Sequence, residues 1–137
     1  MTPLHEITSK IIVQTIELSE QAHDLIIEVL SENNDSVTAA YSLCLSSRYN
    51  QLNKSQKIKL IYIVLNDKKS KIRLLKNYKY ISKCRCYEFD IIINNFEPEL
   101  LMEIFKRYPK DYLDGLIKRH KKNKKFISII TLLKMNN

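Results

Sequence analysis

The chain contains a single glycine, Gly115, among its 137 residues. Nucleotide-binding loops of the P-loop and Rossmann types need several glycines, because glycine lets the backbone approach phosphates closely. Two-residue β-hairpins also depend on glycine in Asn-Gly or Asp-Gly turns, so a many-stranded antiparallel sheet lacks its usual turn residues. Helix-breaking residues are few and Leu, Ile, Lys and Glu are abundant, so the sequence favours an all-α fold.

Length and apolar content indicate the size of that fold. With 137 residues, 45% of them hydrophobic, the chain can build a single core, and we expect one helical domain over residues 1–137. Apolar residues recur at helical spacing in nearly every segment. This predicts about seven to eight short helices, arranged as a bundle or as stacked helical hairpins resembling an α-solenoid.

Caps and apolar spacing place the helices of the first half. Apolar stripes predict helices near residues 4–18 and 22–30, and a third over 37–45. Asn53 followed by Gln56 resembles a capping box, in which each side chain satisfies the other residue's main-chain N–H. Apolar residues follow this pair at i, i+3, i+4 and i+7 spacing, which predicts a fourth helix.

The second half contains one ambiguous segment. Residues 70–83 predict one continuous helix, whereas residues 86–96 match a strand and a helix equally well. We predict a helix for 86–96, because no partner strand is evident. Pro98 and Pro109 stand near the first positions of two further helices, where a missing N–H costs nothing. A last helix carries Phe126, Ile129, Ile130 and Leu133.

Charge is sorted along the chain. Counting Asp, Glu, Lys and Arg, residues 1–47 carry one base and seven acids, residues 48–85 twelve bases and one acid, and residues 86–137 ten bases and seven acids. So basic a segment attracts polyanions whatever its fold. If the acidic first third packs beside the basic middle, the molecule is dipolar and this attraction is weaker.

The basic residues include two groups that could form binding faces. On a continuous helix over 70–83, spacings of four, seven, eleven and fourteen residues return to the same side. The basic stripe on that side is Lys69, Arg73, Lys76, Tyr80 and Lys83. The second group, the basic run, is Lys118, Arg119, Lys121, Lys122, Lys124 and Lys125. We expect the basic run to be an exposed connection between two apolar helices.

Both groups are candidate nucleic-acid contacts. Lys and Arg supply phosphate contacts, and an exposed Tyr80 could stack on a base. A solvated face that keeps the protein soluble is the simpler interpretation, and the basic run is also typical of nuclear-localisation patches. The scarcity of acids over residues 48–85 favours a polyanion partner.

No catalytic or metal-binding pattern accompanies the charge. Cys84 and Cys86 are closer together than the usual zinc-binding pair, and no second ligand pair follows. Cys44 would need a histidine within hydrogen-bond reach to act as a nucleophile, so we expect a buried thiol there. We predict no enzymatic activity, no metal and no cofactor. Surface positions are expected for the histidines, His5, His23 and His120.

The expected location is intracellular. Residues 1–18 include two glutamates and no uninterrupted apolar core, and the longest apolar run, residues 60–65, is far shorter than the roughly 20 residues that cross a bilayer. The three cysteines are most simply reduced thiols. We therefore expect a cytoplasmic protein, with the nucleus as the alternative, and no membrane insertion. A composition rich in Ile, Lys and Asn is what AT-rich codons produce, and it is typical of a virus, an intracellular parasite or a low-GC bacterium.

These features predict a non-enzymatic helical protein that engages RNA or a ribonucleoprotein surface through a basic face. Such binding should be largely independent of sequence and sensitive to salt. The alternative is a helical adaptor or inhibitor that binds an acidic protein surface. Small viral or parasite effectors of Bcl-2-like shape provide the general analogy. An open apolar groove between helices would favour the adaptor, and a continuous positive face would favour RNA.

Overall fold

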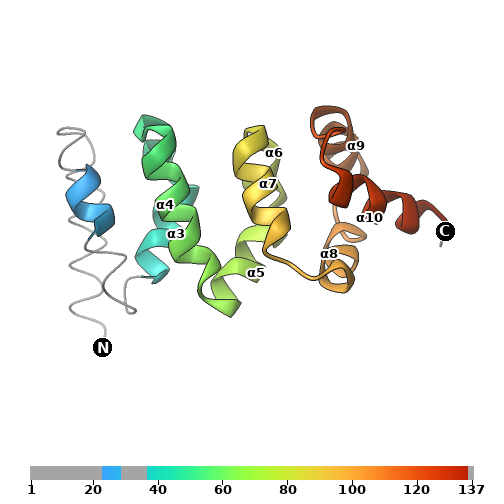
Figure 1. The fold of residues 1–137 in the computed structure, drawn as a ribbon, viewed down its shortest axis with the longest axis horizontal. Helices are drawn as coiled ribbons and strands as arrows, with labels where there is room; N and C mark the ends of the chain where they lie inside the picture. The colour runs from blue at the N-terminus through green and yellow to red at the C-terminus, as the bar shows by residue number, and fades with distance from the viewer. Residues whose placement is uncertain (1–22, 29–36, 136–137) are drawn as a thin grey trace. The chain divides into compact units, whose positions relative to one another are not determined.

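The computed structural model describes residues 23–28 and 37–135. Every regular element in these ranges is a helix, which confirms the all-α prediction, while the helix predicted near 4–18 lies outside them. Residues 23–28 are helical. The elements that follow are α3 (Val37–Leu45), the 3-10 helix η2 (Ser47–Gln51), α4 (Lys54–Leu65), α5 (Lys68–Lys76), α6 (Tyr78–Lys83), α7 (Cys86–Asn94), α8 (Pro98–Phe105), α9 (Lys110–Arg119) and α10 (Lys124–Met135) (Figure 1).

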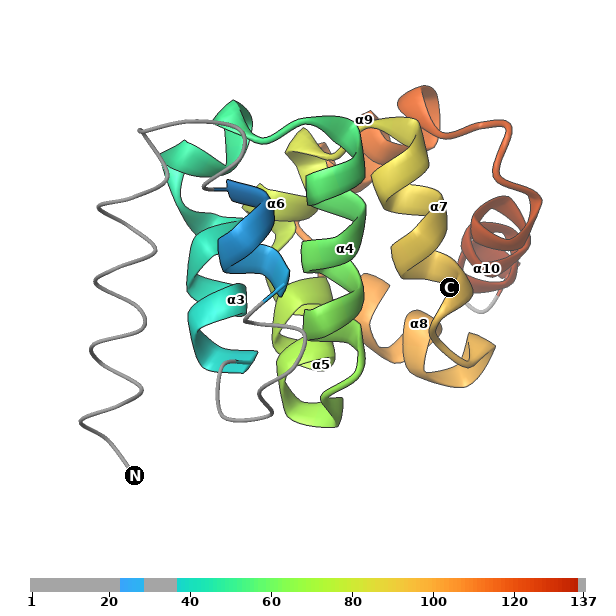
Figure 2. The same cartoon turned by 60° about the vertical axis from the view of Figure 1, so that its left-hand side comes forward.

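The chain divides into two compact units, Met1–Lys71 and Ile72–Asn137. In the first unit, α3 and α4 lie side by side (Figure 2). The predicted capping box is confirmed, because the Asn53 side chain accepts from the Gln56 N–H at 2.8 Å and Gln56 Oε1 accepts from the Asn53 N–H at 2.9 Å. The single domain expected over 1–137 stays a prediction.

The continuous helix predicted over 70–83 is wrong, because the chain breaks at Asn77. The Asn77 N–H donates to the Leu74 carbonyl and ends α5, while the Asn77 side chain accepts from the Tyr80 N–H at 3.0 Å and caps α6. Asparagine suits this position, since its side chain replaces a missing helical hydrogen bond. The residues before and after the break therefore do not share one helical face.

The helix predicted for residues 86–96 is confirmed as α7. The carboxylate of Glu88 accepts from the Arg85 N–H at 2.8 Å at its start. Pro98 occupies the first turn of α8, and Pro109 is the N-cap residue of α9, as the sequence indicates. The apolar residues at helical spacing are all buried. They are Phe89, Ile92 and Ile93 in α7 and Phe96 just after its end.

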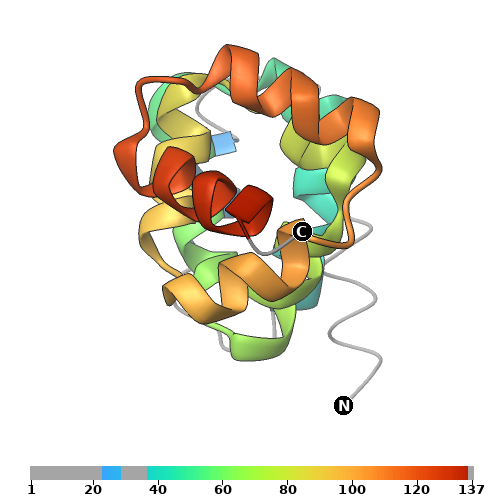
Figure 3. The same ribbon diagram turned by 90° about the vertical axis from the view of Figure 1, so that its right-hand side faces the viewer.

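An aromatic cluster forms the core of the second unit. Phe126 of α10 meets Phe89 of α7 edge to face at 4.9 Å and Phe105 of α8 at 5.2 Å between ring centroids. Edge-to-face contact suits the charge distribution of aromatic rings. The buried Tyr108 hydroxyl donates to the main-chain carbonyl of Leu75, so the loop after α8 is attached to α5. Figure 3 shows α10, in dark red, between α9 and α8.

Candidate nucleic-acid interface

The C-terminal end of the basic stripe meets the basic run in the second unit. The guanidinium of Arg119, the last residue of α9, donates to the main-chain carbonyl of Ser82 near the end of α6. The Cys86 thiol Sγ also lies 3.9 Å from the Arg119 carbonyl oxygen. Lys83, the last residue of the stripe, is therefore a neighbour of the run.

We name the exposed bases at this meeting point the basic corner. It consists of Lys83, Arg85, Lys118, Arg119, Lys121 and Lys122. The segments that supply it, residues 78–87 and 115–125, contain no aspartate or glutamate. Carbonyls in the last turn of a helix lack helical partners and carry partial negative charge, so the Arg119 guanidinium is favourably placed over the end of α6.

The rest of the stripe does not assemble as predicted. Tyr80 is buried, with 8% of its surface exposed, because the break at Asn77 rotates α6 relative to the predicted continuous helix. The predicted exposed position of Tyr80 is therefore wrong. Arg73 and Lys76 are exposed on α5, and Lys69, also exposed, belongs to the first unit.

The basic run is not the separate connection that the sequence indicates. Lys118 and Arg119 form the last turn of α9, and Lys124 and Lys125 begin α10. Lys124 is exposed, whereas Lys125 is half-buried and its Nζ donates to the Phe96 carbonyl at 2.7 Å.

The exposed Lys121 and Lys122 occupy the short turn between α9 and α10. Asn123 fixes the end of this turn, because its side-chain oxygen accepts from the Phe126 N–H at 2.9 Å. Its Nδ2 donates to Asp90 of α7 at 2.7 Å. The two lysines therefore stand on a turn that is attached at its far end to two helices.

His120 attaches the near end of the same turn. Its ring stacks on Phe89 at 3.8 Å between centroids, with 8° between the planes, and only 2% of the residue is exposed. Neither ring nitrogen has a hydrogen-bond partner within residues 23–28 and 37–135. Burial, reinforced by the charge of Arg119, lowers the pKa of His120, while Asp90 acts weakly in the opposite direction.

The expected surface position is therefore wrong for two histidines. His120 and His23 are both buried, and His5 lies outside the described residues. An imidazole has a flat apolar face that can stack on an aromatic ring, which explains how His120 enters the core from within a lysine-rich segment.

A recess of about 350 Å³ lies between α6 and α9 beside the basic corner. Its walls are formed by Ser82, Lys83, Asp111, Tyr112, Gly115, Leu116 and Arg119. The half-buried Tyr112 ring lies 4.7 Å from the ring of Tyr78 at the start of α6. The sequence signal for this recess is the single glycine, Gly115, inside an apolar helical pattern, where glycine costs helix stability relative to alanine.

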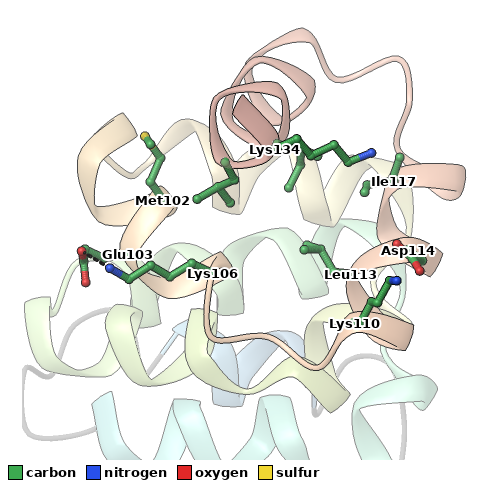
Figure 4. Close-up of a pocket in the computed structure, with 10 residues that line it drawn as sticks. Met102, Glu103, Lys106, Lys110, Leu113, Asp114, Ile117 and Lys134 are labelled. Atoms are coloured by element: carbon green, nitrogen blue, oxygen red, sulfur yellow. Dashed lines mark hydrogen bonds and ion pairs between the residues drawn. The ribbon is translucent and has the colours of Figure 1, made fainter. Parts of the chain in front are cut away.

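A larger groove of about 760 Å³ lies between α8, α9 and α10 (Figure 4). Its apolar lining is Met102, Leu113, Ile117, Ile130 and Leu133, and its charged lining is Glu103, Lys106, Lys110, Asp114 and Lys134. Lys106 and Glu103 form an ion pair at 2.8 Å. Leu132 and Met135 of α10 are exposed by 45% and 74%.

The thiols differ in exposure. Cys44 is buried, as predicted, and so is Cys84, whose Sγ lies 3.6 Å from the Tyr80 carbonyl, whereas Cys86 is exposed. Within residues 23–28 and 37–135, no group of three or more His, Cys, Asp or Glu residues is placed to hold a metal ion. In the same ranges no helix has the length and apolar character required to cross a membrane.

Comparison of the chain with protein-family models, with curated proteins and with solved structures found no match.

Proposed function

We propose that the protein binds RNA through the basic corner. The observation that carries this proposal is the contact between Arg119 and Ser82, which brings two acid-free basic segments together. Clustered positive charge attracts a polyanion at long range, and each phosphate that a lysine or arginine neutralises releases condensed counterions. The binding should therefore be tight at low salt and largely independent of RNA sequence.

The basic corner is also held in place before RNA arrives. The Arg119 guanidinium uses part of its donor fork on the Ser82 carbonyl and has further N–H groups for phosphate. The turn that carries Lys121 and Lys122 is attached by the buried His120 and by Asn123. Ordering these side chains on binding therefore costs less than ordering a free loop.

Charge reversal tests the proposal. Lys121→Glu with Lys122→Glu should weaken binding to unrelated RNA sequences alike, and each lost phosphate contact should reduce the slope of log affinity against log salt by roughly 0.7 to 0.9. The matched control is Lys110→Glu with Lys134→Glu, which makes the same charge change at the groove. Equal affinity and equal salt slope in the two double variants would contradict binding at the basic corner.

The groove between α8, α9 and α10 supports a second candidate function, the helical adaptor. Its apolar lining suits the apolar face of an amphipathic helix, and Lys110 and Lys134 can pair with acidic residues on the polar face of that helix. In that account Leu133→Glu removes binding to a protein partner, while Lys121→Glu with Lys122→Glu leaves it unchanged. Quantitative affinity purification of the variants, with RNase-treated samples in parallel, separates the two functions.

A further inference from the structure

Gly115 occupies a position where the chain itself has no need of glycine. It lies in the interior of α9, where glycine is less favourable than every other residue except proline. No glycine with a positive φ occurs within the described ranges. A Cβ built on Gly115 would meet nothing within 4 Å apart from its chain neighbours and the nearby backbone of α9, so packing between the described helices does not require its absence either.

The bare backbone at Gly115 faces the recess between α6 and α9. Asp111, Gly115 and Arg119 are spaced by four residues, so they share one side of α9, and the first and last are about 12 Å apart along the helix axis. Tyr112 lies near the start of α6 through its contact with Tyr78. The recess therefore has an acidic, aromatic end and a cationic end, with the glycine between them.

We infer that this recess holds one nucleotide, an inference that rests on the proposed function and identifies the kind of RNA that it takes. The phosphate lies at the cationic end, against Lys83 and Arg119. The base passes over Gly115, where a side chain would take its space, and contacts the Tyr112 ring. Asp111 repels phosphate from its own end and accepts a hydrogen bond from a ribose hydroxyl or a base N–H.

The dimensions and chemistry of the recess agree with such a ligand. Its volume of about 350 Å³ is within the range of small-molecule sites. A base can enter the recess only when it is unstacked, whereas the bases of a duplex are stacked and paired. Single-stranded RNA should therefore bind more tightly than duplex RNA of the same length.

Filling the recess tests the inference. Gly115→Leu places a side chain where the base would lie, and it should raise rather than lower the melting temperature because leucine is the better helix former. We expect it to weaken binding of a labelled oligouridine about tenfold at fixed salt, with duplex affinity and salt slope unchanged. Ser128→Leu, on an exposed position of α10, is the matched control and should bind like the wild type.

Gly115→Ala provides a second variant with a smaller side chain, and it should give an intermediate loss. Unchanged oligouridine affinity in Gly115→Leu would overturn the inference while leaving RNA binding at the basic corner intact. Absence of binding to both oligouridine and duplex would instead contradict the proposed function itself.

Free uridine monophosphate tests whether the recess takes a free mononucleotide or one nucleotide of an RNA chain. If it binds the wild type and loses affinity in Gly115→Leu, the recess is a mononucleotide site. If only oligouridine shows the Gly115→Leu loss, the recess is one subsite of a longer RNA surface. Either result supports a nucleotide in the recess, and insensitivity of both ligands to Gly115→Leu contradicts it.

Discussion

Phe89 and His120 stack face to face, with ring centroids 3.8 Å apart and planes 8° from parallel. The stack joins α7 to the turn that carries Lys121 and Lys122. Burial there disfavours the protonated imidazole, because a charged ring would lose its water without gaining a hydrogen-bond partner among the described residues. The basic corner is thus attached to the core through a titratable side chain.

This arrangement predicts that acid destabilises the fold through His120. Its folded-state pKa lies below the ordinary value of 6.5, so between these two values the unfolded chain binds the proton more readily. The contribution of His120 to stability is therefore complete above about pH 6.5 and is lost as the pH falls towards the folded-state pKa.

Urea denaturation of the wild type and of His120→Phe, at pH 7.5 and pH 5.5, measures this contribution. Phenylalanine keeps the aromatic stack and cannot titrate, so the variant should lose less stability between the two pH values. Other groups contribute equally to both proteins and cancel in the comparison. Identical pH dependence of the two proteins would show that His120 does not titrate differently on unfolding.

The contact of Arg119 with Ser82 predicts a specific effect of a conservative substitution. Arg119→Lys keeps the positive charge, but an ammonium lacks the planar fork that can hold the carbonyl and reach a phosphate together. We expect several-fold weaker RNA binding with little change in salt slope. Arg107→Lys makes the same change at an exposed residue outside the basic corner, and as the control it should have little effect. Wild-type affinity in Arg119→Lys would mean that the charge alone matters.

Tyr108→Phe should destabilise the second unit. The buried hydroxyl donates to the Leu75 carbonyl, and removing it leaves that carbonyl without this donor. A loss of about 1 to 3 kcal/mol in the free energy of unfolding is expected. Tyr62→Phe removes a hydroxyl from a residue that is 45% exposed and should change stability much less. Equal effects of the two substitutions in chemical denaturation would contradict the buried hydrogen bond.

The thiols should react in order of exposure. Cys86 is exposed, whereas Cys44 and Cys84 are buried, so brief treatment of the native protein with iodoacetamide should modify Cys86 alone. In denaturant all three should react. Peptide mass spectrometry assigns the modified residue, and rapid native labelling of Cys84 would contradict its position in the structure.

Local signals in the sequence identify several helix starts. The capping pair Asn53 and Gln56 and the residue Pro98 act within one turn of helix, so their effect does not depend on the rest of the fold. The break at Asn77 escapes prediction because apolar residues continue at helical spacing on both sides of it. Periodicity alone therefore joins α5 and α6 into one helix.

The candidate site is less predictable, since it depends on contacts between distant segments. Arg119 and Ser82 are separated by 37 positions, and no local pattern shows that the ends of α6 and α9 meet. The burial of His120 likewise depends on Phe89, and its lysine neighbours indicate a surface position. Gly115 is visible in the sequence as a lone glycine, but its place beside a recess requires the fold.

The single glycine permits the most direct measurement of the central claim, that RNA binds where α6 and α9 meet. Protein labelled with ¹⁵N-glycine should give one amide signal, that of Gly115. On addition of unlabelled oligouridine we expect this signal to shift and saturate, and to return as salt is raised. RNA binding confirmed by fluorescence anisotropy with an unchanged Gly115 signal would contradict binding at this site.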